Sequence, residues 1–327
     1  MTGPRRGIAC AGNWIVDIVH SIDRWPRKSD LVHIRDEAVG VGGGAANVAL
    51  DLAAFGVAFP VVPVGLLGMD LHGHAVRDAL TTAGLSDRWM ARTEAAATAH
   101  THVMTVQGDS RTFFYHPGTN DLLDEEHIPV ESLGAEGIAL FYLGYLNLMA
   151  RLDRVGTDGQ TPAARLLARA RAAGMITCVD LVSAESEAFD RTVAAALPQI
   201  DYLFLNEVEA ERASREAVAG PEDREGLLAA AKALQARGAR RVVIHTPAMS
   251  LWLGREAIWA EAQQLPPEDI VSPVGAGDAF CAGCLYGIHE GWTPERSLWL
   301  GHRAASASLK GATATDGIPP LSVLLNG

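Results

Sequence analysis

A glycine-rich turn followed by a carboxylate stands late in the chain, in the stretch VSPVGAGDAFCAG. Gly275, Ala276 and Gly277 come just before a helical pattern, and the first turn of a helix offers unpaired N–H groups and a positive dipole end. Such a turn can stabilise the negative charge on a phosphoryl group during its transfer. Asp278 could accept the proton of a hydroxyl group that attacks the phosphate. The alternative is that Asp278 only caps the helix.

A second glycine-rich turn, in VGGGAANVALDLAAFG, also opens a helical pattern, with Asn47 in its first turns. Its spacing fits neither the phosphate-binding loop GxxxxGK[ST] nor the dinucleotide motif GxGxxG. Asn13 and Asp17 follow the first apolar run, in GNWIVD. They could bind the hydroxyl groups of a polyol, or they could be ordinary turn residues.

In DYLFLNEVEAERAS a predicted strand ends at Asn206, and a helix begins with Glu207 and Glu209. Acidic residues stabilise a helix start in themselves. A carboxylate at a strand end could also hold hydrated Mg²⁺ beside a phosphate.

The stretch FFYHPGTN places Tyr115, His116 and Asn120 where they could contact a substrate, and an ordinary aromatic surface is the equal alternative. Tyr145, in FYLGYL, could face the same pocket, but a buried core position is favoured. His100 and His102 would share one strand face, but no third ligand has the spacing of a metal site. The CxxC pattern of CAGC lies inside a predicted helix, which favours small core residues over redox or metal chemistry.

The elements that must position these residues alternate between two patterns. Short apolar runs such as GIACAG and RRVVIH alternate with segments of helical period, which predicts an α/β core with a parallel sheet covered on both faces. Four helices are expected to end at glycines in the left-handed conformation, Gly56, Gly84, Gly174 and Gly238. The stretch VSPVGAGDAF is expected to join strand-like residues to a helix at the carboxyl edge of the sheet.

Two regions depart from this rhythm. Residues 18–39 contain no convincing helix, and THVMTVQGDSRTFFYHPG predicts a hairpin that turns at residues 107–110. Together they could form a small separate sheet over one edge of the core.

Composition limits the possible partners. The 327 residues are 48% hydrophobic and carry 27 Lys and Arg against 39 Asp and Glu, a formal charge of −12. This balance argues against binding of nucleic acid or anionic lipid, so an anionic ligand would need a locally positive site. Four cysteines are too few for a disulfide framework, and no apolar run has the length of a signal peptide or a membrane span. We expect a soluble cytoplasmic protein.

The two glycine-rich motifs, in this order and at this separation, resemble the signatures of the PfkB, or ribokinase-like, family of carbohydrate kinases. GNWIVD resembles the family's first substrate motif, GLLGMDLHG its GxDxxG turn, and Asn206 with Glu209 its N-x-x-E motif. The resemblance covers nearly the whole chain. It implies a single ribokinase-like domain over residues 1–327, with a Rossmann-like three-layer core, a mostly parallel sheet and a small β-sheet lid from segments of about 17–40 and 98–117.

The resemblance also implies transfer of the ATP γ-phosphoryl group to a hydroxymethyl group of a sugar or sugar-like molecule. Asp278 would be the base, and Gly275, Ala276 and Gly277 would form the anion hole. The resemblance assigns the remaining roles as follows: Asn206 and Glu209 govern Mg²⁺ and the phosphates, with Glu209 towards the metal, and Asp17, Gly43 and Asn47 hold the sugar hydroxyls, with Asn13 beside them.

The sequence departs from the family pattern in three places. Ser272 and Pro273 replace an Asp and a Thr of the monovalent-cation site, which puts potassium activation in doubt. His245, Pro247 and Ser250 replace a Thr and two glycines of the nucleotide loop, so His245 is expected at the nucleotide with an altered grip. Gly44 stands where ribokinases carry a lysine, which argues against ribose.

The sequence therefore predicts a Mg-ATP-dependent kinase that acts on a primary hydroxyl of a small carbohydrate. A nucleoside is the alternative substrate, because the G-N-x-x-x-D form also resembles adenosine kinases. A phosphorylated sugar is disfavoured, since no Lys or Arg stands inside the two front motifs to pair with a second phosphate. A catalytically weak or inactive sugar-binding protein that has kept the fold is the alternative from another class. Exposed strand edges suggest a homodimer through the lid.

Overall fold

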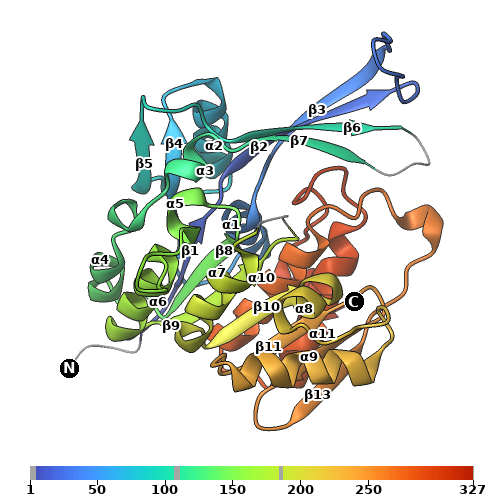
Figure 1. Cartoon of the computed structure of the whole chain (residues 1–327). Coiled ribbons are helices and arrows are strands. Elements are labelled where there is room, and N and C mark those ends of the chain that lie inside the picture. Colours follow the sequence, from blue (N-terminus) through green and yellow to red (C-terminus); the bar gives the residue numbers. More distant parts are fainter. Residues whose placement is uncertain (1–4, 107–110, 184–186, 327) are drawn as a thin grey trace.

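The computed structural model describes residues 5–106, 111–183 and 187–326. Its centre is a nine-stranded sheet with the strand order β13-β12-β11-β10-β9-β8-β1-β4-β5 (Figure 1). The pairs from β5 to β11 are parallel, and β12 and β13 add to β11 in antiparallel fashion. The strands are β1 (Ile8–Gly12), β4 (Val61–Gly68), β5 (Trp89–Thr93), β8 (Leu140–Leu146), β9 (Ile176–Leu181), β10 (Tyr202–Asn206), β11 (Val242–His245), β12 (Met249–Leu253) and β13 (Ala257–Glu261).

Helices cover both faces of this sheet, because successive side chains of each strand point to opposite faces. In β1, Ile8 and Cys10 belong to one buried cluster, and Ala9 and Ala11 belong to the other. The first cluster includes residues of α1 (Gly44–Phe55), α2 (Leu71–Thr82), α10 (Ala276–His289), α11 (Pro294–Ser308) and α12 (Leu321–Asn326). The second includes residues of α4 (Val130–Ala135), α6 (Pro162–Ala172), α7 (Phe189–Ala196), α8 (Glu207–Ser214) and α9 (Arg224–Ala236). The predicted three-layer α/β core is confirmed.

Short helical segments complete the connections. They are α3 (Thr119–Leu122), α5 (Ala150–Asp153) and the 3-10 turns η1 (Glu125–His127), η2 (Leu197–Gln199) and η3 (Pro267–Asp269).

A separate four-stranded sheet extends away from the core, in the order β3-β2-β6-β7 (Figure 1). Its strands are β2 (Ile15–Ile22), β3 (Ile34–Gly42), β6 (His100–Thr105) and β7 (Thr112–His116). The predicted small sheet is thus present, and β2 follows β1 after two residues. The predicted turn at residues 107–110 lies outside the described residues.

The four glycines predicted to end helices do so. Gly56, Gly84, Gly174 and Gly238 have φ angles of 69°, 71°, 82° and 124°, in the range that favours glycine.

The expectation of strand-like residues before Gly275 is wrong. β13 ends at Glu261, and the chain then reaches α10 through η3 and an irregular segment. The N–H groups of Val271 and Ser272 donate to the carbonyl of Leu309 at the end of α11, and Pro273 has no N–H to offer a sheet. The loop is therefore held by a helix end and not by a neighbouring strand.

The four cysteines are buried and unpaired, as expected of core residues. Within the described ranges, no helix has both the length and the apolar character that crossing a membrane would require.

Candidate active site

Two side chains hold Asp278 in place at the predicted site. It lies in the first turn of α10 and is 4% exposed. Its Oδ2 accepts hydrogen bonds from the Nδ2 of Asn47 and from the hydroxyl of Tyr145, both at 2.8 Å. Its Oδ1 has no partner among the described residues. One oxygen is thus anchored, and the other is free to accept a proton.

Burial is the main cause that raises the pKa of Asp278 to about 6, and the two hydrogen bonds oppose this shift. The carboxylates of Glu209 and Asp17 raise it further. At neutral pH the group is ionised but more basic than an exposed aspartate, which suits a general base.

The glycine turn before Asp278 needs its small residues. Gly275 has a φ of 83°, and a Cβ there would lie 2.4 Å from the carbonyl oxygen of Ala314. A Cβ on Gly277 would lie 3.0 Å from the ring of His245. The turn therefore holds a backbone shape that other residues would strain, with the first N–H groups of α10 at its end.

Tyr145 faces the predicted site, which is the alternative that the sequence favoured less. It lies in β8 at a register shift between Leu143 and Leu146, has a φ of 59°, and its hydroxyl donates to Asp278. A Cβ on Gly44 would lie 2.7 Å from its ring. The tyrosine ring thus occupies the space beside Gly44, so the absence of a side chain at that position has a structural reason.

The residues of the first motif lie around the same centre. A Cβ on Gly42 would lie 2.1 Å from Oδ2 of Asp17, so the glycine makes room for this carboxylate. Burial raises the pKa of Asp17 to about 6. Asn13 is fully buried, with its Oδ1 unpartnered among the described residues, and its carbonyl lies where a Cβ on Gly43 would clash.

His116 and Asn120 were both predicted to contact the substrate, and the register of the small sheet decides the position of His116. Asp17 pairs with Thr101, which pairs with Tyr115, so these three side chains share one face. His116 follows Tyr115 and lies on the opposite face, where its ring is 4.8 Å from that of His100. The fold therefore does not bring His116 together with Asp17. Asn120 is buried, and it donates to the hydroxyl of Tyr115.

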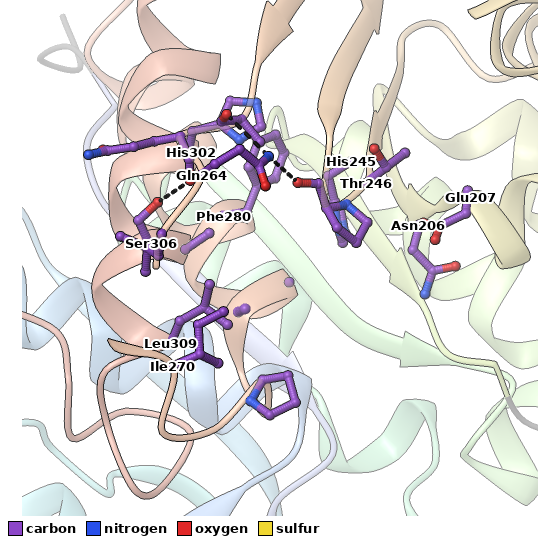
Figure 2. A pocket seen from close by; sticks show the side chains of 18 of the residues that line it. Asn206, Glu207, His245, Thr246, Gln264, Ile270, Phe280, His302, Ser306 and Leu309 are labelled. Atoms are coloured by element: carbon purple, nitrogen blue, oxygen red, sulfur yellow. Dashed lines mark hydrogen bonds between the residues drawn. The ribbon is translucent and has the colours of Figure 1, made fainter. Parts of the chain in front are cut away.

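A pocket of about 480 Å³ borders the glycine turn, and Figure 2 shows side chains that line it. Asn206, Glu207 and Thr246 lie on one side of it, and Phe280, Ser306 and Leu309 lie on the other. Ala276 and Gly277 also line it, so the pocket reaches the residue next to Asp278. A mostly apolar cleft of this size that ends at a helix N-terminus suits a nucleotide, with the phosphates at the glycine turn.

His245 lines this pocket, with its ring beside Gly277. Its ring packs on Phe280 at 5.1 Å between centroids, and burial lowers its pKa to about 4. The imidazole is therefore neutral at physiological pH. The hydroxyl of Ser250 forms a hydrogen bond of 2.8 Å with the ring of His302.

Asn206 and Glu209 form a reciprocal cap at the start of α8. Oδ1 of Asn206 accepts from the N–H of Glu209, and Oε2 of Glu209 accepts from the N–H of Asn206. Oε1 of Glu209 accepts from Ser183. Each carboxylate oxygen of Glu209 thus accepts one hydrogen bond and keeps acceptor capacity for a further partner.

Sequence reasoning missed Asp180. It lies near the end of β9 and is 5% exposed. Burial, followed by the charges of Glu209 and Asp278, raises its pKa well above the usual range. A single charged residue within the apolar run MITCVDLV, at the carboxyl end of a strand, was the available signal. Three carboxyl groups that repel one another's charge create a site that favours a cation.

Comparison with known proteins decides the family. The model of the pfkB family carbohydrate kinases matches residues 6–320. The chain belongs to this family.

Three individual proteins similar to this chain share between 20% and 34% sequence identity with it over the aligned residues. The ATP-dependent ribose-1-phosphate kinase of Halopiger xanaduensis is 27% identical over 84% of this chain and 81% of its own. Similarity to the 1-phosphofructokinase of Haemophilus influenzae, 34% identical, covers only 31% of either chain. The ribokinase of Arabidopsis thaliana, solved with ribose and ATP, superposes with a TM-score of 0.80 at 20% identity, over 99% of this chain and 98% of that one. The pfkB family membership makes the protein a carbohydrate kinase, and the ribokinase comparison shows the fold.

Proposed function

We propose that the protein transfers the γ-phosphoryl group of ATP to a primary hydroxyl group of a small sugar, with Asp278 as the general base. One observation carries this proposal: Asp278 has one anchored and one free carboxylate oxygen at the start of α10, next to a pocket of nucleotide size. The free oxygen would take the proton of the sugar hydroxyl as that hydroxyl attacks the phosphorus atom.

The turn Gly275, Ala276 and Gly277 would stabilise the transferring group. Its position at the N-terminus of α10 directs N–H groups and the positive end of the helix dipole to one point. His245, neutral and packed beside Gly277, would contact the phosphates as a hydrogen-bonding group and not as a cation.

ATP would enter as its magnesium complex, in which the metal neutralises phosphate charge. Asp180 and Glu209 have the oxygen chemistry that Mg²⁺ prefers, and both are buried near Asp278. Among the described residues, no group of three His, Cys, Asp or Glu side chains is arranged to hold a metal ion. Asn206, which lines the nucleotide-sized pocket, would lie beside the phosphates.

Asp17, Asn13, Asn47 and the backbone at Gly43 would bind the sugar. Oδ1 of Asn47 and Oδ1 of Asn13 have no partner among the described residues, so each could accept a hydrogen bond from a sugar hydroxyl. Asn47 also holds Asp278, which would link recognition of the sugar to the position of the base.

The test is an ADP-release assay with Mg-ATP against ketoses, aldoses, sugar acids, polyols and nucleosides. Turnover of a sugar supports the proposal, and turnover of nucleosides alone replaces it with a nucleoside kinase. Asp278→Asn should lower kcat about 10²–10⁴-fold, because the proton acceptor is lost while the shape is kept. Binding of sugar and of an ATP analogue should persist.

Full activity of Asp278→Asn would refute the assignment of the base. If no compound is turned over and an ATP analogue does not bind, the sugar-binding protein without activity becomes the better explanation.

A further inference from the structure

A second pocket, of about 430 Å³, shares no lining residue with the nucleotide pocket. Its walls come from the end of β7, from α3, from the segment between β8 and α5, from α5 with the residues that follow it, and from the start of α7. We call it the arginine pocket, because Arg154 and Arg191 line it.

The arginine pocket borders the proposed sugar site. Tyr115, which shares a sheet face with Asp17, forms part of its wall. The amide of Asn13 donates to the carbonyl of Leu148, another wall residue, at 3.3 Å. Asn120 links Trp14 to Tyr115 through hydrogen bonds of 3.3 and 3.1 Å. A molecule held by Asp17 and Asn13 would therefore have its far end near this pocket.

The two arginines differ from their neighbours, because the described residues supply neither of them with an anionic partner. Arg165, Arg169 and Arg215 each bind a carboxylate, of Glu125, Glu131 and Asp190 respectively. For Arg154 and Arg191, by contrast, the described part of the chain supplies no hydrogen bond or ion pair to the guanidinium group. In a chain of net charge −12, two unpaired guanidinium groups at one pocket make a locally positive site.

The acidic groups of the pocket only partly offset this charge. Asp121 is one of them. Asp153 is the other; its Oδ2 accepts the N–H of Met149, and burial raises its pKa to about 7. Burial also raises the pKa of Tyr115 to about 12, so its hydroxyl stays neutral and can donate a hydrogen bond.

Asn147 adds an unsatisfied group. It lines the pocket, is 8% exposed, and neither atom of its side-chain amide has a partner among the described residues. Its φ of 78° is unusual outside glycine, and such backbone positions cluster at ligand sites. A buried amide without partners indicates a ligand that would supply them.

We propose that the arginine pocket receives an anionic group, a phosphate ester or a carboxylate, at the end of the sugar away from the hydroxyl that is phosphorylated. Arg154 and Arg191 would pair with the anion, and Asn147 and Tyr115 would donate hydrogen bonds to it. The inference rests on the proposed function, because the kinase site determines which end of the sugar enters the pocket. The arginines lie outside the two front motifs, which is why the sequence disfavoured a phosphorylated sugar.

The experiment compares neutral sugars with their 1-phosphates and their sugar acids as acceptors in the ADP-release assay. We expect a sugar 1-phosphate or a sugar acid to have the highest kcat/KM. Which of these two series has the higher value shows whether the pocket prefers a phosphate or a carboxylate. Arg154→Gln and Arg191→Gln should each raise KM for that substrate about 10- to 100-fold, with kcat within about twofold. Values for neutral sugars should not change.

Arg151→Gln is the matched control. It removes the same charge from α5, but Arg151 does not line the pocket, so KM should stay as in the wild type. The KM of the anionic substrate should also rise with salt concentration in the wild type and less so in the double variant Arg154→Gln/Arg191→Gln.

Two failures are distinguishable. If neutral sugars are the best substrates and the double variant matches the wild type, the pocket assignment is overturned and the kinase stands. If nothing is phosphorylated, the proposed function fails, and calorimetry with the same sugar phosphates and sugar acids decides the pocket. Binding by the wild type that the double variant loses would then support the pocket. Equal binding by the two proteins, or no binding by the wild type, would overturn it.

Discussion

At the scale of single residues, the site combines a buried carboxylate with two neutral donors. Asn47 and Tyr145 stabilise the charged form of Asp278, while burial disfavours it more strongly, and the balance leaves the pKa at about 6. The base is active only when ionised. We therefore expect kcat/KM to fall about tenfold for each pH unit below 6, as measured in a pH profile with saturating Mg-ATP. An acid limb centred below pH 5 would contradict this assignment.

Tyr145 offers a second test of the same balance. Tyr145→Phe removes the hydroxyl that donates to Oδ2 but keeps the ring beside Gly44. A hydrogen bond to a charged group contributes about 1.5–3 kcal/mol, and one pKa unit corresponds to 1.36 kcal/mol. The pKa of Asp278 should rise, and the acid limb should move up by about one to two pH units. An unshifted limb would mean that this hydrogen bond does not control the base.

At the scale of elements, the start of α10 depends on one glycine. Gly275→Ala would place a Cβ against Ala314 in a left-handed conformation, so the turn should shift, and kcat should fall at least tenfold. Gly56→Ala is the control. Its φ is also positive, at 69°, but nothing lies within 4 Å of the added Cβ. It should cost only ~1–2 kcal/mol of unfolding free energy, with full activity.

Denaturant unfolding and the ADP-release assay measure both variants. Equal activity loss in the two would show that helix stability, and not the shape of the glycine turn, limits the reaction.

The small sheet has two faces, because strand side chains alternate. Asp17 and Tyr115 lie on the first. On the second face, cross-strand pairing places four side chains in one row, in the order Val39, Ile18, His102 and Phe114. Val39 and Phe114 are each 58% exposed. Exposed apolar side chains beside open strand edges favour association of sheets.

At the scale of the whole molecule, this leads to a proposed homodimer through the small sheet. Wild-type protein should give a dimer mass by light scattering at micromolar concentration. Phe114→Glu should give a monomer, since a charge would be buried at the interface. Arg24→Glu, also on the small-sheet side but paired on the surface with Asp30, should leave the dimer intact. A monomeric wild-type protein would refute the proposal.

The sequence by itself determined much of the local structure and the chemistry of the motifs. Alternating apolar runs and helical periods specified the layered α/β core, since each strand must bury two faces and each helix one. Glycines marked helix ends and the turn before Asp278, because their left-handed φ angles are a local requirement that other residues meet poorly.

Only the tertiary structure decided which distant groups meet. The donors to Asp278 stand 231 and 133 positions away, at Asn47 and Tyr145, and no periodicity encodes such pairs. Register sent His116 to the face opposite Asp17, and packing placed Arg154 and Arg191 at one pocket from separate helical segments. Contacts between elements depend on how whole layers pack, which is a property of the assembled chain and not of any one segment.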